Sequence, residues 1–506
     1  MNRDGALESA WQAGMETYTS KNSNTPHSIY DVVIVGGGIT GITTALQLQK
    51  AGKKCVIAEA NNIGFGTTGG TTAHLNTIFD LSYDEAIKKF GEDNARLLAA
   101  AGLEAMQLIK TNVQQYEIDC DFSEIDGYLF SVEEDQDELL DKMVEATKQV
   151  GLPIEFVDES PFPIPFRKIS RVEGQAQFNP IKYIYALAKI FEDNGGVILQ
   201  QCRVKSIDES DALTIHTSQG TLLAYNAVYA THIPPGVNIL HFRCAPYRSY
   251  AIAVKLKNNQ YPAALGYDLC EPYHYYRSEV IEGKKYLIAG GEDHKTGHEE
   301  NTEQCFRRLE SFVRKYFDVE EVAFKWSSQF FEPADGLPYI GHLPGNRENI
   351  FTATGFGGNG MMFGTLSAII LTDFIQKKEN KYANLFEPAR VKPVAGFTNF
   401  VKEAADVVSH LVGDSFAGKK IEEMAELAAG EATLVKHDGQ LIAVYKDMQH
   451  QVHAVNAACT HIKCTMHWNN AELSWDCPCH GSRFSIDGEL LSAPARKDLE
   501  KINLEF

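Results

Sequence analysis

Cysteine and histidine side chains gather near the C-terminus in a pattern that could hold a metal centre. The string Cys459-Thr-His461 is followed, after residues 462–476, by Cys477-Pro-Cys479-His480. Two cysteines and two histidines in the forms C-x-H and C-x-x-H suit a pair of iron atoms, one held by thiolates and the other by imidazoles. The alternative is a structural zinc ion with the same four ligands. Because the C-x-H spacing is shorter than the usual zinc spacing, the pattern favours iron.

A glycine-rich turn near the N-terminus could bind a dinucleotide. Gly36, Gly38 and Gly41 form G-x-G-x-x-G directly after the apolar run 31–35 and at the start of an expected helix. Such glycines allow a tight turn, a close approach of the backbone to a pyrophosphate, and close helix packing. Glu59 ends the next apolar run, where an acid would accept a hydrogen bond from a ribose hydroxyl. These residues predict a dinucleotide-binding strand–helix–strand unit.

Two further glycine-rich segments could contact the rest of the dinucleotide. Residues 63–73 (IGFGTTGGTTA) carry small hydroxyl side chains that could bond a second phosphate face. Residues 353–361 lead into an expected helix at 360–376, whose N-terminus would favour negative charge on a nearby group. No second Rossmann motif for a nicotinamide cofactor is visible, so we do not expect the electron donor to be a nicotinamide.

The elements expected around these motifs form a large α/β part and a small all-β part. Polarity patterns predict strands at 197–207, 212–217, 222–230 and 350–354, and a hairpin-like pair at 248–256 and 284–291. They predict helices at about 83–116, 134–150 and 180–194. Residues 378–415 are expected to be a connector that ends in a short amphipathic helix, and short β runs follow from about residue 420.

Composition excludes several classes of function. The 506 residues carry a net charge of −20, which argues against a surface that binds nucleic acid. No apolar stretch is long enough to span a membrane. The N-terminus shows no apolar export signal, so we expect a cytoplasmic protein in which the six scattered cysteines are buried and reduced.

The glycine-rich motifs resemble those of the D-amino-acid-oxidase-like FAD oxidoreductases, the superfamily of glycine and sarcosine oxidases. The resemblance covers roughly residues 28–380 and rests on IGFGTTGGTTA, DGLPYIG and ATGFGGNGM. It implies an α/β FAD-binding Rossmann-like domain with an α+β substrate domain, and it puts the turn before residue 361 beside the isoalloxazine ring. The expected FAD-binding residues are Gly36, Gly38, Gly41, Glu59, Gly66, Thr67, Thr68, Thr72, Val204, Gly336, Gly357, Gly358, Gly360 and Met361.

The C-terminal part resembles a Rieske [2Fe–2S] domain, with CTHIKC and CPCHGSRF as the matching strings. The resemblance implies Cys459 and Cys477 as ligands of one iron, and His461 and His480 as ligands of the other. It also implies a disulfide between Cys464 and Cys479; two reduced neighbouring thiols are the alternative, because cytoplasmic disulfides are rare. Ser482 matches a serine that bonds a cluster sulfur. Phe484 replaces a tyrosine that would donate a second bond, so we expect a lower potential than in quinol-oxidising relatives.

The two resemblances together imply a bacterial FAD-dependent oxidoreductase with a C-terminal Rieske domain. The expected divisions are a polar leader at 1–27, the oxidoreductase domain at 28–380, a connector at 381–419 and the Rieske domain at 420–506. Within the oxidoreductase domain, the FAD-binding parts are expected at about 28–90, 170–235 and 330–380, and the substrate-binding parts at about 91–169 and 236–329.

The implied activity is oxidation of a small-molecule substrate, at a C–H bond next to an amine or hydroxyl group. Electrons would leave singly through the iron–sulfur cluster to an external acceptor, a protein or a quinone. Two alternatives remain: a reductase in which an external donor supplies electrons through the cluster, and a flavoenzyme whose Rieske domain only docks or senses redox state. Each version excludes a membrane span and a nucleic-acid partner.

The substrate pocket is the least determined part of the site. In glycine-oxidase-like relatives an arginine clamps the substrate carboxylate, and aligning Trp326 and Asp335 with them puts Phe330 at that position. Oxidation of amino acids is therefore doubtful. His74 is a possible contact of the cofactor. Candidate pocket residues are Arg248, His274, Tyr276 and Arg277, with Tyr247, Tyr250 and Tyr275 as further possibilities.

Overall fold

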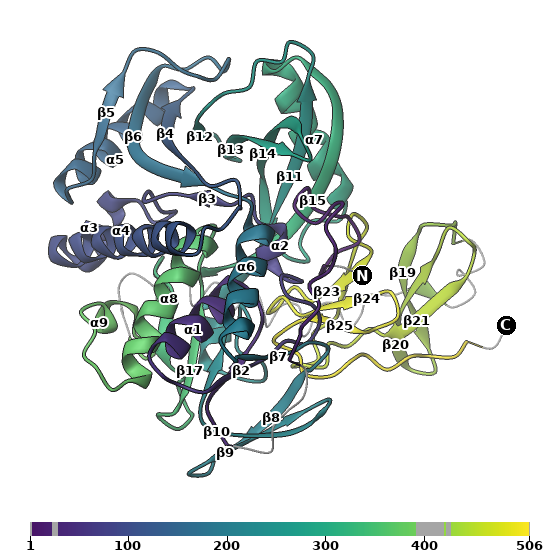
Figure 1. Cartoon of the computed structure of the whole chain (residues 1–506). Coiled ribbons are helices and arrows are strands. Elements are labelled where there is room, and N and C mark those ends of the chain that lie inside the picture. The colour runs from purple at the N-terminus through teal and green to yellow at the C-terminus, as the bar shows by residue number, and fades with distance from the viewer. Residues whose placement is uncertain (1–2, 23–28, 391–418, 421–426, 505–506) are drawn as a thin grey trace.

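A computed structural model of the chain describes residues 3–22, 29–390, 419–420 and 427–504 (Figure 1). None of the helices among these residues has both the length and the apolar character needed to cross a bilayer. The amphipathic helix expected at the end of the 378–415 connector lies outside the described residues. Three layers of structure concern the site: a mainly parallel sheet, a mainly antiparallel sheet, and a pair of small sheets near the C-terminus.

The first sheet contains the strand–helix–strand unit that the glycine motif predicts. β1 (Tyr30–Val35) lies between β2 (Cys55–Ala58) and β10 (Gly220–Tyr229), and both pairings are parallel. Five of the six residues of β1 are buried apolar side chains, as a strand buried on both faces requires. The remaining strands are β7 (Val197–Leu199), β8 (Val204–Asp208), β9 (Leu213–Thr217), β16 (Tyr339–His342) and β17 (Ile350–Thr354).

Three helices pack against this sheet, and one of them contacts the other two. α1 (Ile39–Lys50) packs against both α8 (Gly360–Ile375) and α6 (Pro180–Asp193). α8 is apolar on nearly all sides, as expected for a helix surrounded by protein. The short helices α2 (Thr67–Gly70) and α9 (Ala383–Phe386) complete this half of the oxidoreductase part.

The second sheet has nine strands and forms the roof of the oxidoreductase part in Figure 1. The expected hairpin-like pair is present as β11 (Cys244–Leu256) and β14 (Lys284–Lys295), which are antiparallel neighbours. The other strands are β3 (His74–Leu75), β4 (Ser123–Ser131), β5 (Ile154–Val157), β6 (Lys168–Gln177), β12 (Leu265–Asp268), β13 (His274–Ile281) and β15 (Val319–Pro333). The helical elements around it are α3 (Tyr83–Phe90), α4 (Glu92–Gln115), η1 (Glu134–Gln136), α5 (Asp137–Gln149), η2 (Ile239–Phe242) and α7 (Thr302–Tyr316).

Two sequence-based elements are divided in the structure. The helix expected at 83–116 is broken between α3 and α4 at Gly91, whose φ of 86° is incompatible with a continuous helix. The strand expected at 197–207 becomes β7 and β8, because Gln201, between them, has a φ of 55° and turns the chain. In both places one residue with positive φ interrupts a pattern that is otherwise continuous.

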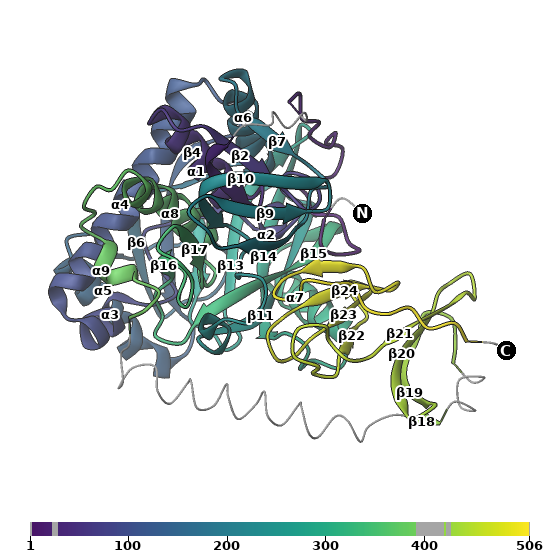
Figure 2. The same cartoon turned by 90° about the horizontal axis from the view of Figure 1, so that it is seen from below.

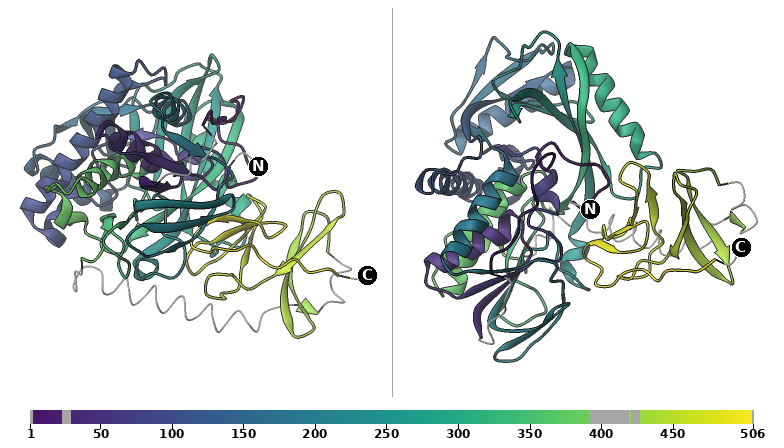
Figure 3. Two further views of the ribbon diagram at one scale, coloured as in Figure 1. Left: turned by 60° about the horizontal axis from the view of Figure 1, so that its bottom comes forward. Right: turned by 45° about the vertical axis from the view of Figure 1, so that its right-hand side comes forward.

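The C-terminal part consists of two four-stranded sheets. One contains β18 (Lys419–Lys420), β19 (Ala432–His437), β20 (Gln440–Lys446) and β21 (Val452–Asn456), and the other contains β22 (His467–Asn469), β23 (Ser474–Asp476), β24 (Arg483–Ser485) and β25 (Leu490–Ser492). The second sheet lies against the oxidoreductase part, beside β11, β15 and α7, whereas the first projects away from it (Figures 2 and 3).

The N-terminal segment lies between the two parts. The start of the described segment 3–22 lies beside α2 and the C-terminal strands in Figure 1, whereas its end reaches α6, where the Tyr18 hydroxyl donates to Glu192. Trp11 is 1% exposed, its Nε1 donates to the carbonyl oxygen of Thr71, and its ring lies 5.1 Å from the Arg277 guanidinium. The stretch expected to be a polar leader therefore contributes side chains to the interior.

Buried charges join this segment, the roof sheet and the C-terminal part. We call the set the junction network; all its members are at most 4% exposed. It contains three arginines and three carboxylates, so its formal charge is balanced. Its members are Arg3, Asp4, Arg248, Glu472, Asp476 and Arg483.

Glu472 is the centre of the junction network. Its carboxylate lies 3.3 Å from Nη1 of Arg3 and 3.9 Å from Nη1 of Arg248, and it accepts a hydrogen bond from the Ser327 hydroxyl at 2.7 Å. Burial by itself would raise the pKa of Glu472, but Arg3, Arg248 and Arg483 outweigh burial and hold the pKa below its ordinary value. The carboxylate is therefore ionised in the folded protein.

Glu472→Gln should destabilise the folded chain by about 3–5 kcal/mol, because it leaves buried arginines without their counter-charge. Urea unfolding measures this difference. The matched control is Glu85→Gln in the more exposed pair Lys89–Glu85, which should cost less than about 1 kcal/mol. Because folding lowers the pKa of Glu472, its contribution is complete above the ordinary value of 4.5 and is lost as the pH falls through the folded value. Equal losses for both variants would contradict this account.

Candidate functional site

A cavity of about 560 Å³ lies where the two large sheets and the C-terminal part meet. Its walls come from the glycine turn after β1, residues 58–61 after β2, the α2 segment, the inner face of the roof sheet and the turn before α8. Residues 490–493, 495 and 496 of the C-terminal part form a further wall. One cavity therefore contacts both parts of the chain.

The glycine turn has the shape needed for a pyrophosphate. Gly36 has a φ of 112°, and a Cβ there would lie 2.4 Å from the carbonyl oxygen of Ala230. A Cβ at Gly41 would lie 2.0 Å from the carbonyl oxygen of Gly36, so only glycine allows α1 to approach the turn. Gly38 is the N-cap of α1 and has no side chain to cap the helix, while the N–H of Ile39 donates to the Thr68 hydroxyl at 3.1 Å. The N-terminus of α1 therefore faces the cavity, where a helix end favours an anionic group. These features fit the phosphate-binding end of a dinucleotide.

Glu59 stands at the end of β2, as expected, and lines the cavity. Its carboxylate accepts N–H hydrogen bonds from Gly37 at 2.6 Å and from Asn61 at 2.7 Å. Burial raises the pKa of Glu59, and the two backbone donors and Arg203 partly offset that effect. The carboxylate thus ties the glycine turn to the loop after β2, at the position where the sequence predicts a ribose contact.

Most of the expected FAD-binding residues lie on the cavity wall. Gly41 does not, since it packs α1 against the turn, and neither does Gly336, whose turn lies against Leu81. His74 also lines the cavity, and its Nδ1 is 3.0 Å from the Tyr267 hydroxyl. The expected residues on the wall are Gly36, Gly38, Glu59, Gly66, Thr67, Thr68, Thr72, Val204, Gly357, Gly358, Gly360 and Met361.

The turn before α8 is held by a residue that the sequence analysis missed. Asp80 accepts a hydrogen bond from the N–H of Gly358 at 2.6 Å, and its own N–H donates to Oδ1 of Asn359 at 3.0 Å. A Cβ at Gly357 would lie 2.6 Å from the Asp80 carboxylate. Asp80 follows no recognisable motif, so only the fold reveals that it faces the last glycine-rich turn.

None of the candidate pocket residues Arg248, His274, Tyr276 and Arg277 lines the cavity. Arg248 belongs to the junction network. His274 contacts Asp268 and stacks on Phe312 of α7 at 3.7 Å, and Tyr276 also donates to Asp268. Arg277 lies behind the wall, where it donates to the carbonyl oxygens of Thr72, Ala73 and Phe178 and pairs with Glu279.

The alternation of side chains along a strand explains this placement. On β11, Ser249 and Ala251 line the cavity, while Arg248 and Tyr250 point to the opposite face. On β13, Tyr275 lines it, whereas its neighbours on either side do not. The sequence analysis therefore selected the correct strands but, for most residues, the face that packs on α7. Other lining residues that it missed are Asn76, Tyr267, Tyr273 and Asp293.

The expected iron ligands come together in the C-terminal part. The Cys459 and Cys477 thiols lie within hydrogen-bond distance of one another, and the His461 and His480 rings are 5.0 Å apart. All four residues have buried donor groups, and both histidine Nδ1 atoms have no hydrogen-bond partner among the described residues. Unpaired buried nitrogens beside two free buried thiols fit the ligand set of a metal cluster. The Ser482 hydroxyl contacts Cys459, as a serine that bonds the cluster would.

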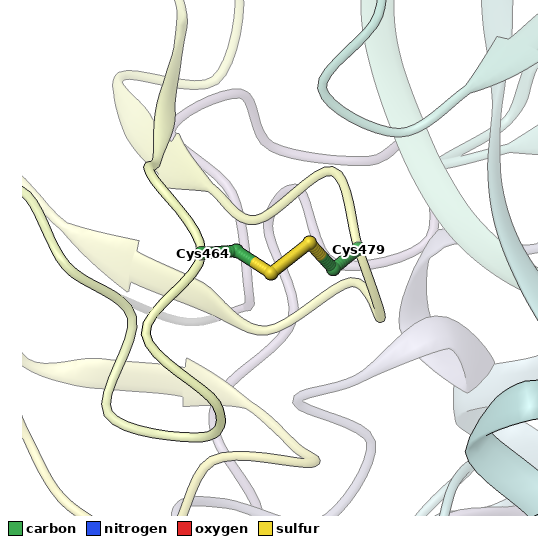
Figure 4. The surroundings of a disulfide bond; sticks show 2 residues. All are labelled: Cys464 and Cys479. Atoms are coloured by element: carbon green, nitrogen blue, oxygen red, sulfur yellow. A yellow bond between two sulfur atoms is a disulfide. The ribbon is translucent and has the colours of Figure 1, made fainter. Parts of the chain in front are cut away.

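Cys464 and Cys479 form a disulfide, which confirms the expected pair (Figure 4). Their sulfur atoms lie within 4.8 Å of the Cys477 sulfur, so the bond joins the two ligand-bearing loops directly beside the expected cluster. Because both sulfurs are engaged in the bond, the thiolates available to iron here are those of Cys459 and Cys477.

The oxidoreductase part covers the two histidines. Nε2 of His461 is 3.1 Å from the carbonyl oxygen of Gly236, and the ring of His241, in η2, is 4.9 Å from the His461 ring. The ring of Phe242 is 5.3 Å from the His480 ring. Both imidazoles are thus enclosed at a contact between the two parts of the chain.

Comparison with known proteins agrees with these features. The model of the FAD dependent oxidoreductase family matches residues 31–374, and that of the Rieske [2Fe-2S] domain matches residues 419–503. The chain belongs to the FAD-dependent oxidoreductase family. It is thus an oxidoreductase with FAD and a Rieske [2Fe–2S] cluster as its cofactors.

Relatives of this FAD-dependent oxidoreductase include one that matches it over nearly the whole of both chains. YhfW of Bacillus subtilis, described by its name as a Rieske 2Fe-2S iron-sulfur protein, is 33% identical over 94% of each chain. Gamma-glutamylputrescine oxidoreductase of Escherichia coli is 23% identical over 70% of this chain and 86% of its own. Glycine oxidase of Geobacillus kaustophilus has the same fold over 72% of this chain and 99% of its own, with a TM-score of 0.61 and 18% identity.

Gly36→Ala should remove most of the bound FAD from the purified oxidoreductase, because its Cβ would collide with the Ala230 carbonyl oxygen. The control is Gly52→Ala, which has a φ of 80° but no atom within 4 Å of the new Cβ. Both variants place an alanine at a positive φ. A difference between them in the ratio of flavin to protein absorbance therefore reports the clash of the Gly36→Ala Cβ with the Ala230 carbonyl oxygen. Equal FAD contents would contradict the proposed pyrophosphate position.

Cys459→Ser should reduce the iron content from about two atoms per chain to near zero, since the cluster loses a thiolate ligand. Cys305→Ser is the control, because Cys305 is a free buried cysteine far from the C-terminal loops in sequence. Iron and acid-labile sulfide assays with low-temperature EPR measure the outcome. Full iron in the Cys459 variant would exclude this ligand assignment.

Proposed function

We propose that this chain is a dehydrogenase that oxidises a small molecule at a C–H bond next to an amine or hydroxyl group. Electrons then leave singly through the iron–sulfur centre to an external acceptor. When bound, FAD supplies two-electron chemistry and the cluster supplies one-electron chemistry. The name of the E. coli relative, which refers to an amine, supports a bond next to nitrogen.

The observation that carries the proposal is the cavity wall shared by the two parts. Gln329 of β15 lines the cavity, and its main-chain carbonyl accepts a hydrogen bond from the Thr67 hydroxyl at 2.9 Å. Its side-chain amide donates to the carbonyl oxygen of Gly481 at 2.8 Å, directly after His480. One buried residue therefore bonds both the FAD-binding α2 segment and a cluster loop.

The enclosure of the histidine ligands supports the same proposal. Gly236 accepts a hydrogen bond from His461, while His241 and Phe242 exclude water from the imidazole edges. The junction network keeps the two parts in this arrangement. These residues orient the cluster loops toward the oxidoreductase part, as direct electron exchange within one chain requires.

Gln329→Leu should slow electron exchange between the two cofactors while FAD and iron contents stay unchanged, because it removes the bond to Gly481. Gln177→Leu is the control, since this buried glutamine of β6 donates to the carbonyl oxygen of Ser278 and does not line the cavity. The holoenzyme is reduced anaerobically with amines, amino acids and hydroxy acids in turn. Stopped-flow absorbance follows the flavin, and freeze-quench EPR follows the cluster.

Reduction of the flavin followed promptly by reduction of the cluster supports the proposal. A cluster that never exchanges electrons with the flavin would instead favour a docking or redox-sensing role. Substrate reduction driven by electrons that enter at the cluster, without the reverse reaction, would favour a reductase.

A further inference from the structure

The end of the cavity that lies against the roof sheet has one sign of charge. Among the described residues that line the cavity, Arg203 and Arg496 carry its only arginine or lysine side chains. Both are near the C-terminal wall, where they donate to the carbonyl oxygens of Leu490 and Pro235. The opposite end is lined by the acidic residues Asp80, Glu271, Asp293 and Glu332. Asp268 also lines it, but its carboxylate accepts hydrogen bonds from His274 and Tyr276 behind the wall.

Asp293 is the acid at this end with an unsatisfied oxygen. Its Oδ1 is buried and has no hydrogen-bond partner within the described part of the chain. Burial raises the pKa of Asp293 to about 7, and the nearby hydroxyls of Ser249 and Tyr273 only partly offset that rise. Asp80 raises the pKa further, so a positive charge at this point would relieve an unfavourable environment.

Aromatic rings stand beside this carboxylate. The rings of Tyr273 and Tyr275 are 5.8 Å apart and tilted by 40°, and both residues line the cavity. The Tyr275 hydroxyl is 2.9 Å from the Ser249 hydroxyl, which fixes the direction of its ring. Tyrosine faces attract cations, and they do so more strongly where water is excluded.

Among the described lining residues, no arginine or lysine lies at the same end to clamp a substrate carboxylate. Phe330, the residue expected at the position of the arginine clamp, lines the cavity and is 8% exposed. Arg248 and Arg277, the other arginines considered for that task, lie behind the wall, where they bond protein groups. An anionic substrate would therefore meet carboxylates and aromatic rings with no basic partner.

We propose that this end of the cavity binds the ammonium group of a cationic amine substrate, with Asp293 as its ionic partner and Tyr273 and Tyr275 beside it. The inference deepens the proposed function, on which it rests, by naming the substrate class. It assigns Asp293 as a residue that determines specificity, and it excludes amino acids held through their carboxylate.

Three probes that share a tert-butyl group and differ in charge test the inference: tert-butylammonium, pivalate and tert-butanol. tert-Butylamine has no hydrogen on the carbon next to nitrogen, so it can bind without being oxidised. Each probe is titrated into the FAD-loaded protein, and the change in flavin absorbance gives its Kd. The wild-type protein should bind tert-butylammonium more tightly than either other probe.

Asp293→Asn should weaken tert-butylammonium binding by about tenfold or more, since a hydrogen-bonded ion pair is lost. Glu271→Gln removes a charge of the same sign from an exposed residue of the same wall and should change Kd much less. FAD content and thermal unfolding check that both variants are folded. If Asp293→Asn does not fold, the order of the three probes on the wild-type protein still decides.

Tighter binding of pivalate, or equal Kd values for tert-butylammonium in the wild-type protein and folded Asp293→Asn, would overturn the inference. Binding is measured without turnover, so the result is separate from the test of electron exchange. A protein that binds tert-butylammonium but never reduces its cluster keeps this inference and loses the proposed electron route.

Discussion

The junction network is the interaction on which the rest of the arrangement depends. Three arginines and three carboxylates are buried together, and none could remain charged there without the others. Because the partners come from the N-terminal segment, the roof sheet and the C-terminal part, each of these pieces fixes the position of the other two. A shift of the C-terminal part would expose or separate several ions at once, and it would also open one wall of the cavity.

The cavity combines two supports of different character. At the end beside the glycine turn, backbone groups and glycines determine the shape of the cavity. Neither Gly36 nor Gly41 has space for a Cβ atom. At the roof-sheet end, the alternate side chains of β11, β13 and β14 determine its chemistry. Substituting a side chain on one face of a strand can leave the backbone in place. The roof-sheet residues that line the cavity can therefore change while the glycine turn keeps its shape.

Motifs in the sequence predicted the two cofactors correctly, since glycine turns and the cysteine–histidine spacing are local chemical requirements. The strand–helix–strand unit, the disulfide and the small all-β part were all expected. The pocket was harder: His274 and Tyr275 are neighbours of similar polarity, and only the register of β13 decides which one faces the cavity. Arg248 has the chemistry of a substrate anchor, but its partners Glu472 and Asp476 lie more than two hundred positions away, where no local pattern could indicate them.

The pairing of Arg3 with Glu472 also has a consequence for biosynthesis. Residues near position 3 leave the ribosome long before residues 472–483 have been translated. Arg3 therefore stays hydrated until the carboxylate of Glu472 is available to pair with it. The oxidoreductase part can thus assemble its sheets early, but it is sealed only by the last strands to emerge. A chain that ends before those strands would have an open cavity wall and would leave Arg3 and Arg248 without the carboxylates of Glu472 and Asp476.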